Sequence, residues 1–173
     1  MKLHFLVCII ALGCIAAAQD TGKTAAKHVA AKHAKSAAAA PKNAFMPNDI
    51  QYGPPPAFVP AGATLAVLEG NPMGTIGDYT IRMKMPDGYK IPPHWHPKRE
   101  NVTVISGTLK VGMGDKFDET KMMSFPAGSF AYLDPSMHHY ASTSGEIVIQ
   151  IHGKAPVKIN YVNPDDDPSK AKK

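Results

Sequence analysis

The sequence has almost no cysteine. Its two cysteines, Cys8 and Cys14, both lie within the first 18 residues, so the rest of the chain contains no thiol. Disulfide frameworks, cysteine nucleophiles and thiolate metal sites are therefore excluded from residue 19 onward. A metal site in that part of the chain has to be built from imidazole and carboxylate groups.

Long apolar runs are also absent, and we expect no membrane span. The one apolar segment, residues 5–18 after Met1-Lys2, is too short to cross a bilayer but has the length of a signal-peptide core. Because Ala16-Ala17-Ala18 offers a small-residue cleavage site, residues 1–18 are predicted to be a signal peptide, which implies a periplasmic or secreted protein. Residues 10–14 are similar to a loose bacterial lipobox, so a lipoprotein anchored at Cys14 is the alternative.

A basic binding face is lacking, although the formal net charge is +5. Residues 44–163 contain ten Lys and Arg and ten Asp and Glu, so this part of the chain has no net charge. Nucleic acid is therefore not an expected partner. The basic excess lies in residues 1–43, of which 19–43 are rich in Ala and Lys, whereas the charged tail, residues 164–173, has three Asp and three Lys. Without an aliphatic stripe, residues 19–43 are predicted to be a disordered linker, and His28 and His33 in it to be isolated solvated imidazoles.

Residues 44–163 consist of short apolar runs separated by Gly and Pro. The runs are residues 64–68, 79–85, 101–106, 109–113, 121–125, 130–133, 139–143, 146–152 and 157–161. This spacing predicts an all-β domain, either a double-sheet jelly roll or a small barrel. Gly107-Thr108 and Ser144-Gly145 are predicted to be hairpin turns. Between residues 146 and 152 three isoleucines alternate with other residues, so the isoleucines are expected to face the core, with Gln150 and His152 facing outward.

Three side chains that can bind a metal lie close together in residues 88–100. His94 and His96 are two apart, so in an extended strand both imidazoles face the same side at a spacing that one cation can span. Pro97 interrupts strand pairing, and the following two residues form a bend that returns Glu100 toward the same cation. Glu100 then shares its strand face with Val102 and Val104, an apolar row that is expected to point inward.

This stretch and a second one, residues 128–143, resemble the two sequence motifs of the cupin superfamily. The first motif has glycine, His-X-His, glutamate and glycine at fixed spacings, and Gly88, His94, His96, Glu100 and Gly107 match every position. The resemblance covers residues 52–161. It implies a small single-domain bacterial cupin, with a double-stranded β-helix, or jelly-roll barrel, over residues 44–163.

The second motif is matched less well. Its spacing places the motif histidine on His139, whereas Asp134, Ser136 and Thr143 stand where the motif has Pro, Gly and Asn. Because adjacent strand residues face opposite sides, only one of His138 and His139 can point inward. The resemblance therefore implies that His139 is a metal ligand and that His138 faces solvent.

The implied metal ligands are His94, His96, Glu100 and His139. Three imidazoles and one carboxylate leave two open positions on an octahedral divalent ion, which suits Fe, Mn, Ni or Co, and at lower coordination Zn or Cu. We expect a small-molecule metalloenzyme of dioxygenase or isomerase type, with Glu100 as the catalytic group that takes a proton. The alternative is a cupin of the cell envelope that binds a metal or small ligand without catalysis. The resemblance also implies a homodimer, with residues 54–59 as a pairing arm.

Overall fold

The computed structural model describes residues 42–170. The predicted signal peptide, Cys14 and nearly all of the predicted linker lie outside the described residues, as do residues 171–173 of the tail. Within residues 42–170 no helix is long and apolar enough to cross a membrane. The described part of the tail forms two short 3₁₀ turns, Pro164–Asp166 and Pro168–Lys170.

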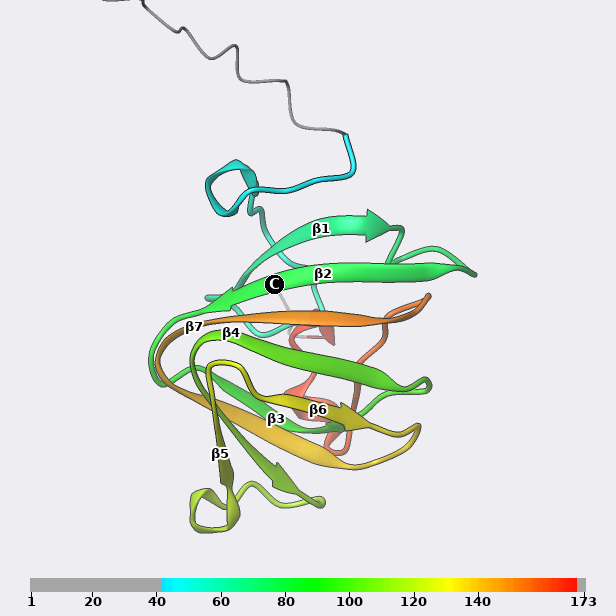
Figure 1. Ribbon diagram of the computed structural model, residues 1–173. Helices are drawn as coiled ribbons and strands as arrows, with labels where there is room; N and C mark the ends of the chain where they lie inside the picture. Colours follow the sequence, from blue (N-terminus) through cyan, green and yellow to red (C-terminus); the bar gives the residue numbers. More distant parts are fainter. Residues whose placement is uncertain (1–41, 171–173) are drawn as a thin grey trace, which may run out of the picture. The chain divides into compact units, whose positions relative to one another are not determined.

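Eight β-strands make up the described domain, joined by antiparallel ladders throughout (Figure 1). The strands are β1 (Thr64–Gly70), β2 (Asp78–Met85), β3 (Lys90–Trp95), β4 (Glu100–Met113), β5 (Met123–Pro126), β6 (Phe130–Leu133), β7 (His139–Lys154) and β8 (Asn160–Tyr161). Two further 3₁₀ turns, η1 (Pro47–Asp49) and η2 (Glu119–Lys121), precede β1 and β5. The all-β prediction is confirmed.

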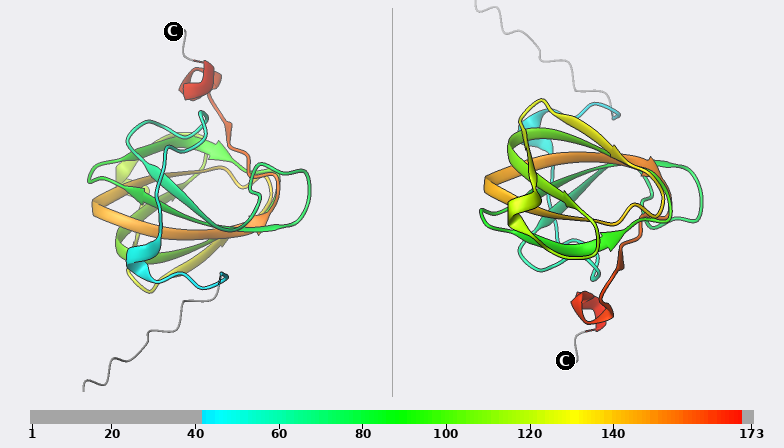
Figure 2. Two further views of the ribbon diagram at one scale, coloured as in Figure 1. Left: turned by 90° about the horizontal axis from the view of Figure 1, so that it is seen from above. Right: turned by 90° about the horizontal axis from the view of Figure 1, so that it is seen from below.

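The strands form two layers because β4 and β7 each run through both. The first half of β4 pairs with the second half of β7, and this pair is flanked by β2 and then β1 on one side and by β6 on the other. The second half of β4 pairs with the first half of β7, flanked by β5 on one side and by β3 and then β8 on the other. In both views of Figure 2 the layers curve toward each other into a barrel, which is the expected jelly roll.

The predicted hairpin turns at Gly107-Thr108 and Ser144-Gly145 are wrong. Both pairs lie inside the long strands β4 and β7, which stay paired on either side of them, with Ser106 opposite Val148 and Thr108 opposite Ser144. The ladder register shifts between residues 104 and 108, so the glycines mark a bulged bend where the two strands pass together from one layer to the other. Only glycine fits at position 107, because its φ is +76° and a Cβ there would lie 2.6 Å from the Glu146 carbonyl oxygen.

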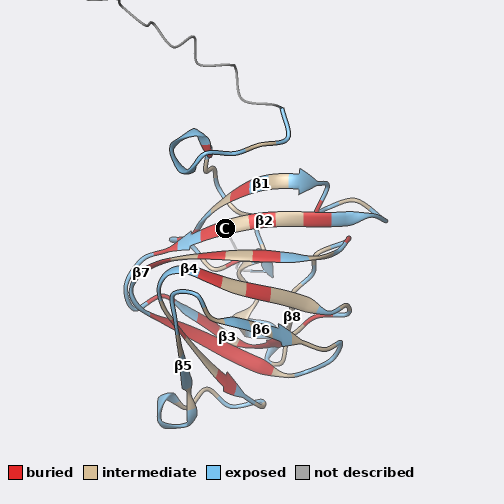
Figure 3. Ribbon diagram, viewed as in Figure 1, coloured by how far each residue is buried: buried red, intermediate tan, exposed pale blue. Residues whose placement is uncertain are grey.

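The core lies between the two layers, and its pattern follows strand alternation. Ile147, Ile149 and Ile151 are buried, whereas His152 is exposed and Gln150 accepts a hydrogen bond from Arg82, as the sequence pattern predicts. Figure 3 shows the same alternation of buried and exposed positions along β2 and β4. The isoleucines are therefore core residues of the barrel, and Gln150 and His152 lie outside the core.

Residues 54–59, expected as a pairing arm, pack on the chain's own barrel. Phe58 and Val59 belong to the core cluster, and the hydroxyl of Tyr161 donates a hydrogen bond to the Phe58 carbonyl. The homodimer stays a prediction.

The observed strands differ in places from the apolar runs of the sequence. Residues 90–95 form a strand that is not among those runs, and β5 begins at Met123 rather than at residue 121. Only Asn160–Tyr161 of the last apolar run is strand.

Replacing Gly107 by alanine should lower the free energy of unfolding by about 3 kcal/mol, from left-handed strain together with the clash against the backbone of β7. Gly88 is the matched control, since its φ is +69° but no atom lies within 4 Å of the position a Cβ would take. Gly88→Ala should therefore cost only about 1–2 kcal/mol, the left-handed strain alone. Urea unfolding of both variants measures the difference, and equal losses would contradict the bend described here.

Candidate metal centre

The three histidines of the motifs meet where the ends of separate strands come together. His94 is the penultimate residue of β3, and His96 follows the strand's end directly. His139 begins β7 and is paired in register with His94. A site built from residues 45 positions apart in the sequence therefore depends on the pairing of β3 with β7.

The imidazoles converge tightly inside the protein. One ring nitrogen from each of His94, His96 and His139 lies within 4.8 Å of the other two. The exposed fractions of the three residues are 3%, 6% and 3%, so water hardly reaches them. Three nitrogens at this spacing form the kind of donor set that holds a divalent transition metal.

Backbone carbonyls fix the protonation pattern of the three rings. The Nδ1 atom of His94 lies 2.8 Å from the Pro92 carbonyl oxygen, that of His139 lies 2.9 Å from the Met137 oxygen, and that of His96 lies 2.7 Å from the Lys158 oxygen. A carbonyl only accepts, so each Nδ1 carries the proton and donates it. In the neutral ring Nε2 then bears the lone pair and is free to bind a metal, the arrangement that such outer hydrogen bonds produce in metal sites.

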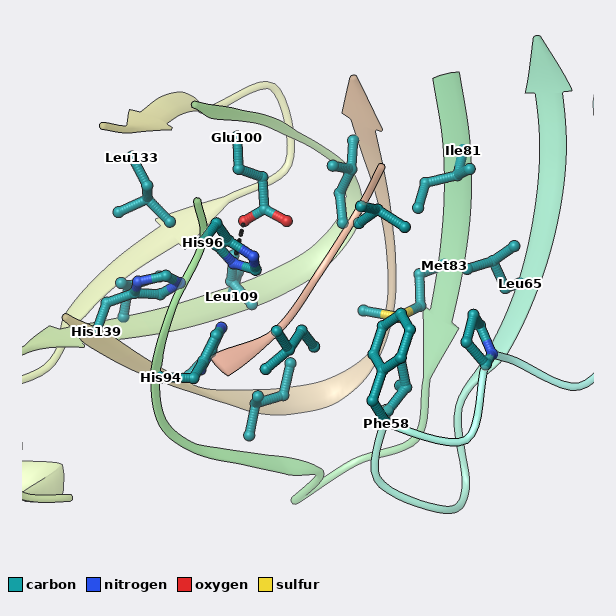
Figure 4. A pocket seen from close by; sticks show the side chains of 18 residues that line it. Phe58, Leu65, Ile81, Met83, His94, His96, Glu100, Leu109, Leu133 and His139 are labelled. Atoms are coloured by element: carbon teal, nitrogen blue, oxygen red, sulfur yellow. Dashed lines mark ion pairs between the residues drawn. The ribbon is translucent and has the colours of Figure 1, made fainter. Parts of the chain in front are cut away.

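Glu100 lies beside this cluster at the start of β4. Its Oε2 atom is 3.4 Å from Nε2 of His96, and its side chain is 12% exposed (Figure 4). The Nε2 atom of His96 is buried and has no hydrogen-bond partner. A lone pair facing a carboxylate in a buried site is unfavourable unless a cation or proton lies between them, so the residues present fit a bound metal ion.

The electrostatics of the site favour the neutral forms of His94 and His139. Burial lowers the pKa of His94 well below its ordinary 6.5, and the neighbouring His139 and His96 lower it further. Burial also lowers the pKa of His139, although the Glu100 carboxylate opposes that shift. Neutral imidazole is the form that binds metals, so burial prepares the site for a cation.

His138 faces away from the cluster, as strand alternation predicts. Its Nδ1 forms an ion pair with Asp115, and its ring stacks on Trp95 with 6.3 Å between centroids. Asp115 is 23 residues from His138 in the sequence, so local strand geometry does not predict this contact. The structure thus separates the two adjacent histidines into one buried in the cluster and one on the surface.

A cavity of about 70 Å³ joins the histidine cluster to the apolar core. Figure 4 shows the histidines and Glu100 gathered at one end, with Phe58, Leu65 and Met83 at the other. The titratable groups that line the cavity are His94, His96, Glu100 and His139. Sequence reasoning missed the apolar wall from residues 56–59 and the three carbonyls that orient the rings, because backbone oxygens have no residue signature.

Comparison with known proteins agrees with this geometry. Residues 81–152 match the family model of the cupin domain. These residues form a cupin domain. The match includes all four motif residues of the site, from His94 to His139. No curated protein matches the sequence of this cupin.

Several solved structures share the cupin fold. The polyketide cyclase RemF from Streptomyces resistomycificus is 13% identical with a TM-score of 0.60, over 73% of this chain and 89% of that one. An RmlC-like cupin from Ralstonia eutropha is 17% identical with a TM-score of 0.53, over 72% and 74% of the two chains. A cupin 2 domain-containing protein from Halorhodospira halophila is 18% identical with a TM-score of 0.50, over 61% and 74%. At such identities the likeness establishes the fold and says nothing of the reaction.

Replacing His96 by alanine should lower the metal affinity by at least about 100-fold, since losing even an outer partner of a ligand costs 10–100-fold. His138→Ala removes the imidazole next to His139, which points away from the cluster, and should leave the metal affinity within about twofold. Metal titration by calorimetry with Zn²⁺ measures both. Loss of metal from the His138 variant would contradict the register of the second motif.

The metal-free protein should lose stability as the pH falls below 6.5. Below that pH the unfolded chain protonates His94 and His139 while the folded chain, with lowered pKa values, does not, so the unfolded state binds more protons and the free energy of unfolding falls. Each histidine contributes a slope of up to about 1.4 kcal/mol per pH unit. Urea unfolding in the presence of a chelator should show a smaller slope for His94→Asn than for the wild type. Equal slopes would contradict the neutral buried state of His94.

Proposed function

We propose that this cupin is a metal-dependent enzyme of dioxygenase or isomerase type that acts on a small oxygen-bearing molecule. The metal ligands are His94, His96 and His139 with Glu100 as the fourth. The observation that carries the proposal is the buried Nε2 atom of His96, which has no hydrogen-bond partner and faces the Glu100 carboxylate at 3.4 Å. A site with this geometry is completed by a cation.

The chemistry of the donor set supports a catalytic metal rather than a structural one. Structural zinc sites are closed tetrahedra built on cysteine thiolates, which the chain lacks from residue 19 onward, whereas catalytic sites keep open positions. Three imidazoles and a carboxylate leave two positions of an octahedral Fe, Mn, Ni or Co ion free, and they also suit Zn or Cu at lower coordination. When bound, the ion supplies Lewis-acid chemistry toward a substrate oxygen.

The chain's own residues contribute orientation, exclusion of water and one proton acceptor. The carbonyls of residues 92, 137 and 158 hold the imidazoles in a single tautomer, so the site needs little rearrangement. Apolar side chains from β2, β7 and residues 56–59 line the rest of the cavity and keep its dielectric constant low. Glu100 is the one carboxylate that lines the cavity, and in this proposal it accepts the proton of the substrate.

A second function, binding without catalysis, is favoured by one observation. The four side chains assigned to the metal are also the only titratable groups lining the cavity, so catalysis would have to use a metal ligand as its base. A cupin that captures a metal or small ligand in the cell envelope has no such requirement. Under either function we propose export, supported by the signal-peptide pattern of residues 1–18, with release of the mature chain or lipid attachment at Cys14.

Glu100→Gln should separate the two functions. Removing the proton acceptor while keeping its size should lower turnover by about 10²- to 10⁴-fold at equal metal content. The control is Glu146→Gln, an exposed carboxylate at the bend of β7, which should leave turnover unchanged. The measurement is oxygen uptake and substrate loss against a panel of small diols and phenols, with protein reconstituted with each candidate metal. A metal-loaded wild type that is inert throughout would favour the binding function.

A further inference from the structure

We propose that the open seam between β5 and β6 binds the apolar body of the substrate, an uncharged aliphatic or aromatic group bearing one oxygen donor. The inference rests on the proposed function, because the donor is assigned to the metal centre. The seam supplies the space for the substrate body that the small inner cavity lacks.

The seam exists because β5 and β6 pair with different halves of the same strand. β5 pairs with residues 108–111 of β4 in one layer, and β6 pairs with residues 100–103 in the other. No ladder in the described domain joins β5 to β6, and Figure 1 shows them running apart from the loop between them. No ladder closes the barrel here: β4, which bends from one layer to the other, joins β5 to β6, as β7 joins β2 to β3.

A pocket of about 300 Å³ occupies the seam, and its lining is mainly apolar. Its main walls are Met113, Met123, Phe125, Ala131, Leu133 and Met137. Ser129 and Tyr132 add hydroxyl groups, and no charged side chain lines it. Three methionines keep 38–62% of their surface exposed, which costs free energy unless a ligand covers them. Methionine side chains adapt to ligands of different shapes, as at other binding surfaces rich in this residue.

The seam pocket adjoins the metal centre. Leu109, Val111 and Leu133 line both the seam pocket and the inner cavity, so these three side chains form the wall between them. Leu133 is also paired in register with Glu100, and the Met137 carbonyl accepts the proton of His139. A molecule in the seam therefore lies against the same residues that position two of the proposed metal ligands.

Size decides which of the two spaces takes the substrate body. Sites that bind small organic molecules commonly enclose about 300–1,000 Å³. The inner cavity, at about 70 Å³, has room for an ion and a few atoms. The seam pocket reaches the usual range and opens to solvent, and its lack of charge selects an uncharged body. The oxygen donor of such a molecule then has the metal as its one strongly polar partner.

The test uses the zinc-loaded full chain and 1-naphthol, whose fluorescence reports binding to an apolar site. Met123→Glu places a carboxylate in the seam and should raise the dissociation constant of 1-naphthol at least tenfold. Ser124→Glu is the matched control, because the neighbouring residue of β5 is exposed but does not line the pocket, and it should change the constant less than twofold. Zinc content and urea midpoint are measured for both variants.

The outcomes separate this inference from the proposed function. Equal binding by two folded, zinc-loaded variants would overturn the seam assignment and leave the metal centre standing. If chelated wild type binds 1-naphthol as well as zinc-loaded protein does, while Met123→Glu still weakens binding, the seam is supported and the role of the metal fails. If sedimentation shows that Met123→Glu dissociates a dimer without affecting 1-naphthol, the seam is a contact between copies and the inference is wrong.

Discussion

The pairing of β4 with β7, and the bend that both strands make together, is the constraint on which the rest of the structure depends. Glu100 and His139 begin these two strands and therefore lie at opposite ends of one antiparallel ladder, opposite Gly153 and Met113. A straight ladder of this length would hold them about 40 Å apart at about 3.4 Å per residue. They line the same small cavity because the ladder folds back at Gly107. The metal centre is thus a consequence of the bulge as much as of the ligands.

Burial sets the second condition on the site. His94 and His139, removed from water, lose the free energy of hydrating a charge, so burial favours their neutral forms, and each of the three imidazoles must still satisfy its polar N–H. Carbonyls from three separate segments accept those protons, which leaves each Nε2 atom to bear the lone pair. The orphaned Nε2 of His96 beside Glu100 is the point where this arrangement is incomplete without a cation. Folding therefore leaves the site prepared to bind a metal rather than to bury three satisfied histidines.

The sequence predicted the side chains of the site better than it predicted their surroundings. Strand alternation placed His94 and His96 on one face and separated His138 from His139, because this rule depends only on local strand geometry, whereas His139 was selected by its place in the second cupin motif. The error at Gly107 has the opposite cause: a glycine with positive φ fits a two-residue hairpin and a bulge equally well, and only the distant partner strand decides between them. The carbonyl of Lys158 had no signal at all, since any residue supplies one. Long-range contacts also pack Phe58 against the barrel core, which no local pattern indicates.

The departures from the second motif show which features of it the fold requires. Ser136 stands where the motif has glycine, yet its φ is +65°, so the backbone keeps the left-handed turn that glycine favours, and its N–H donates to the His96 carbonyl. Asp134, in place of proline, joins the same turn by an ion pair to Arg99, the last residue of the loop that holds His96. Thr143, in place of asparagine, has a hydroxyl that accepts a hydrogen bond from the Tyr89 amide and donates one to the Pro86 carbonyl. Both partners lie in the loop between β2 and β3. At each position the residue has changed while a contact still ties the segment holding His139 to the one holding His94 and His96. The geometry of the metal centre is therefore held by these contacts, and the motif's residue types are one of several ways to make them.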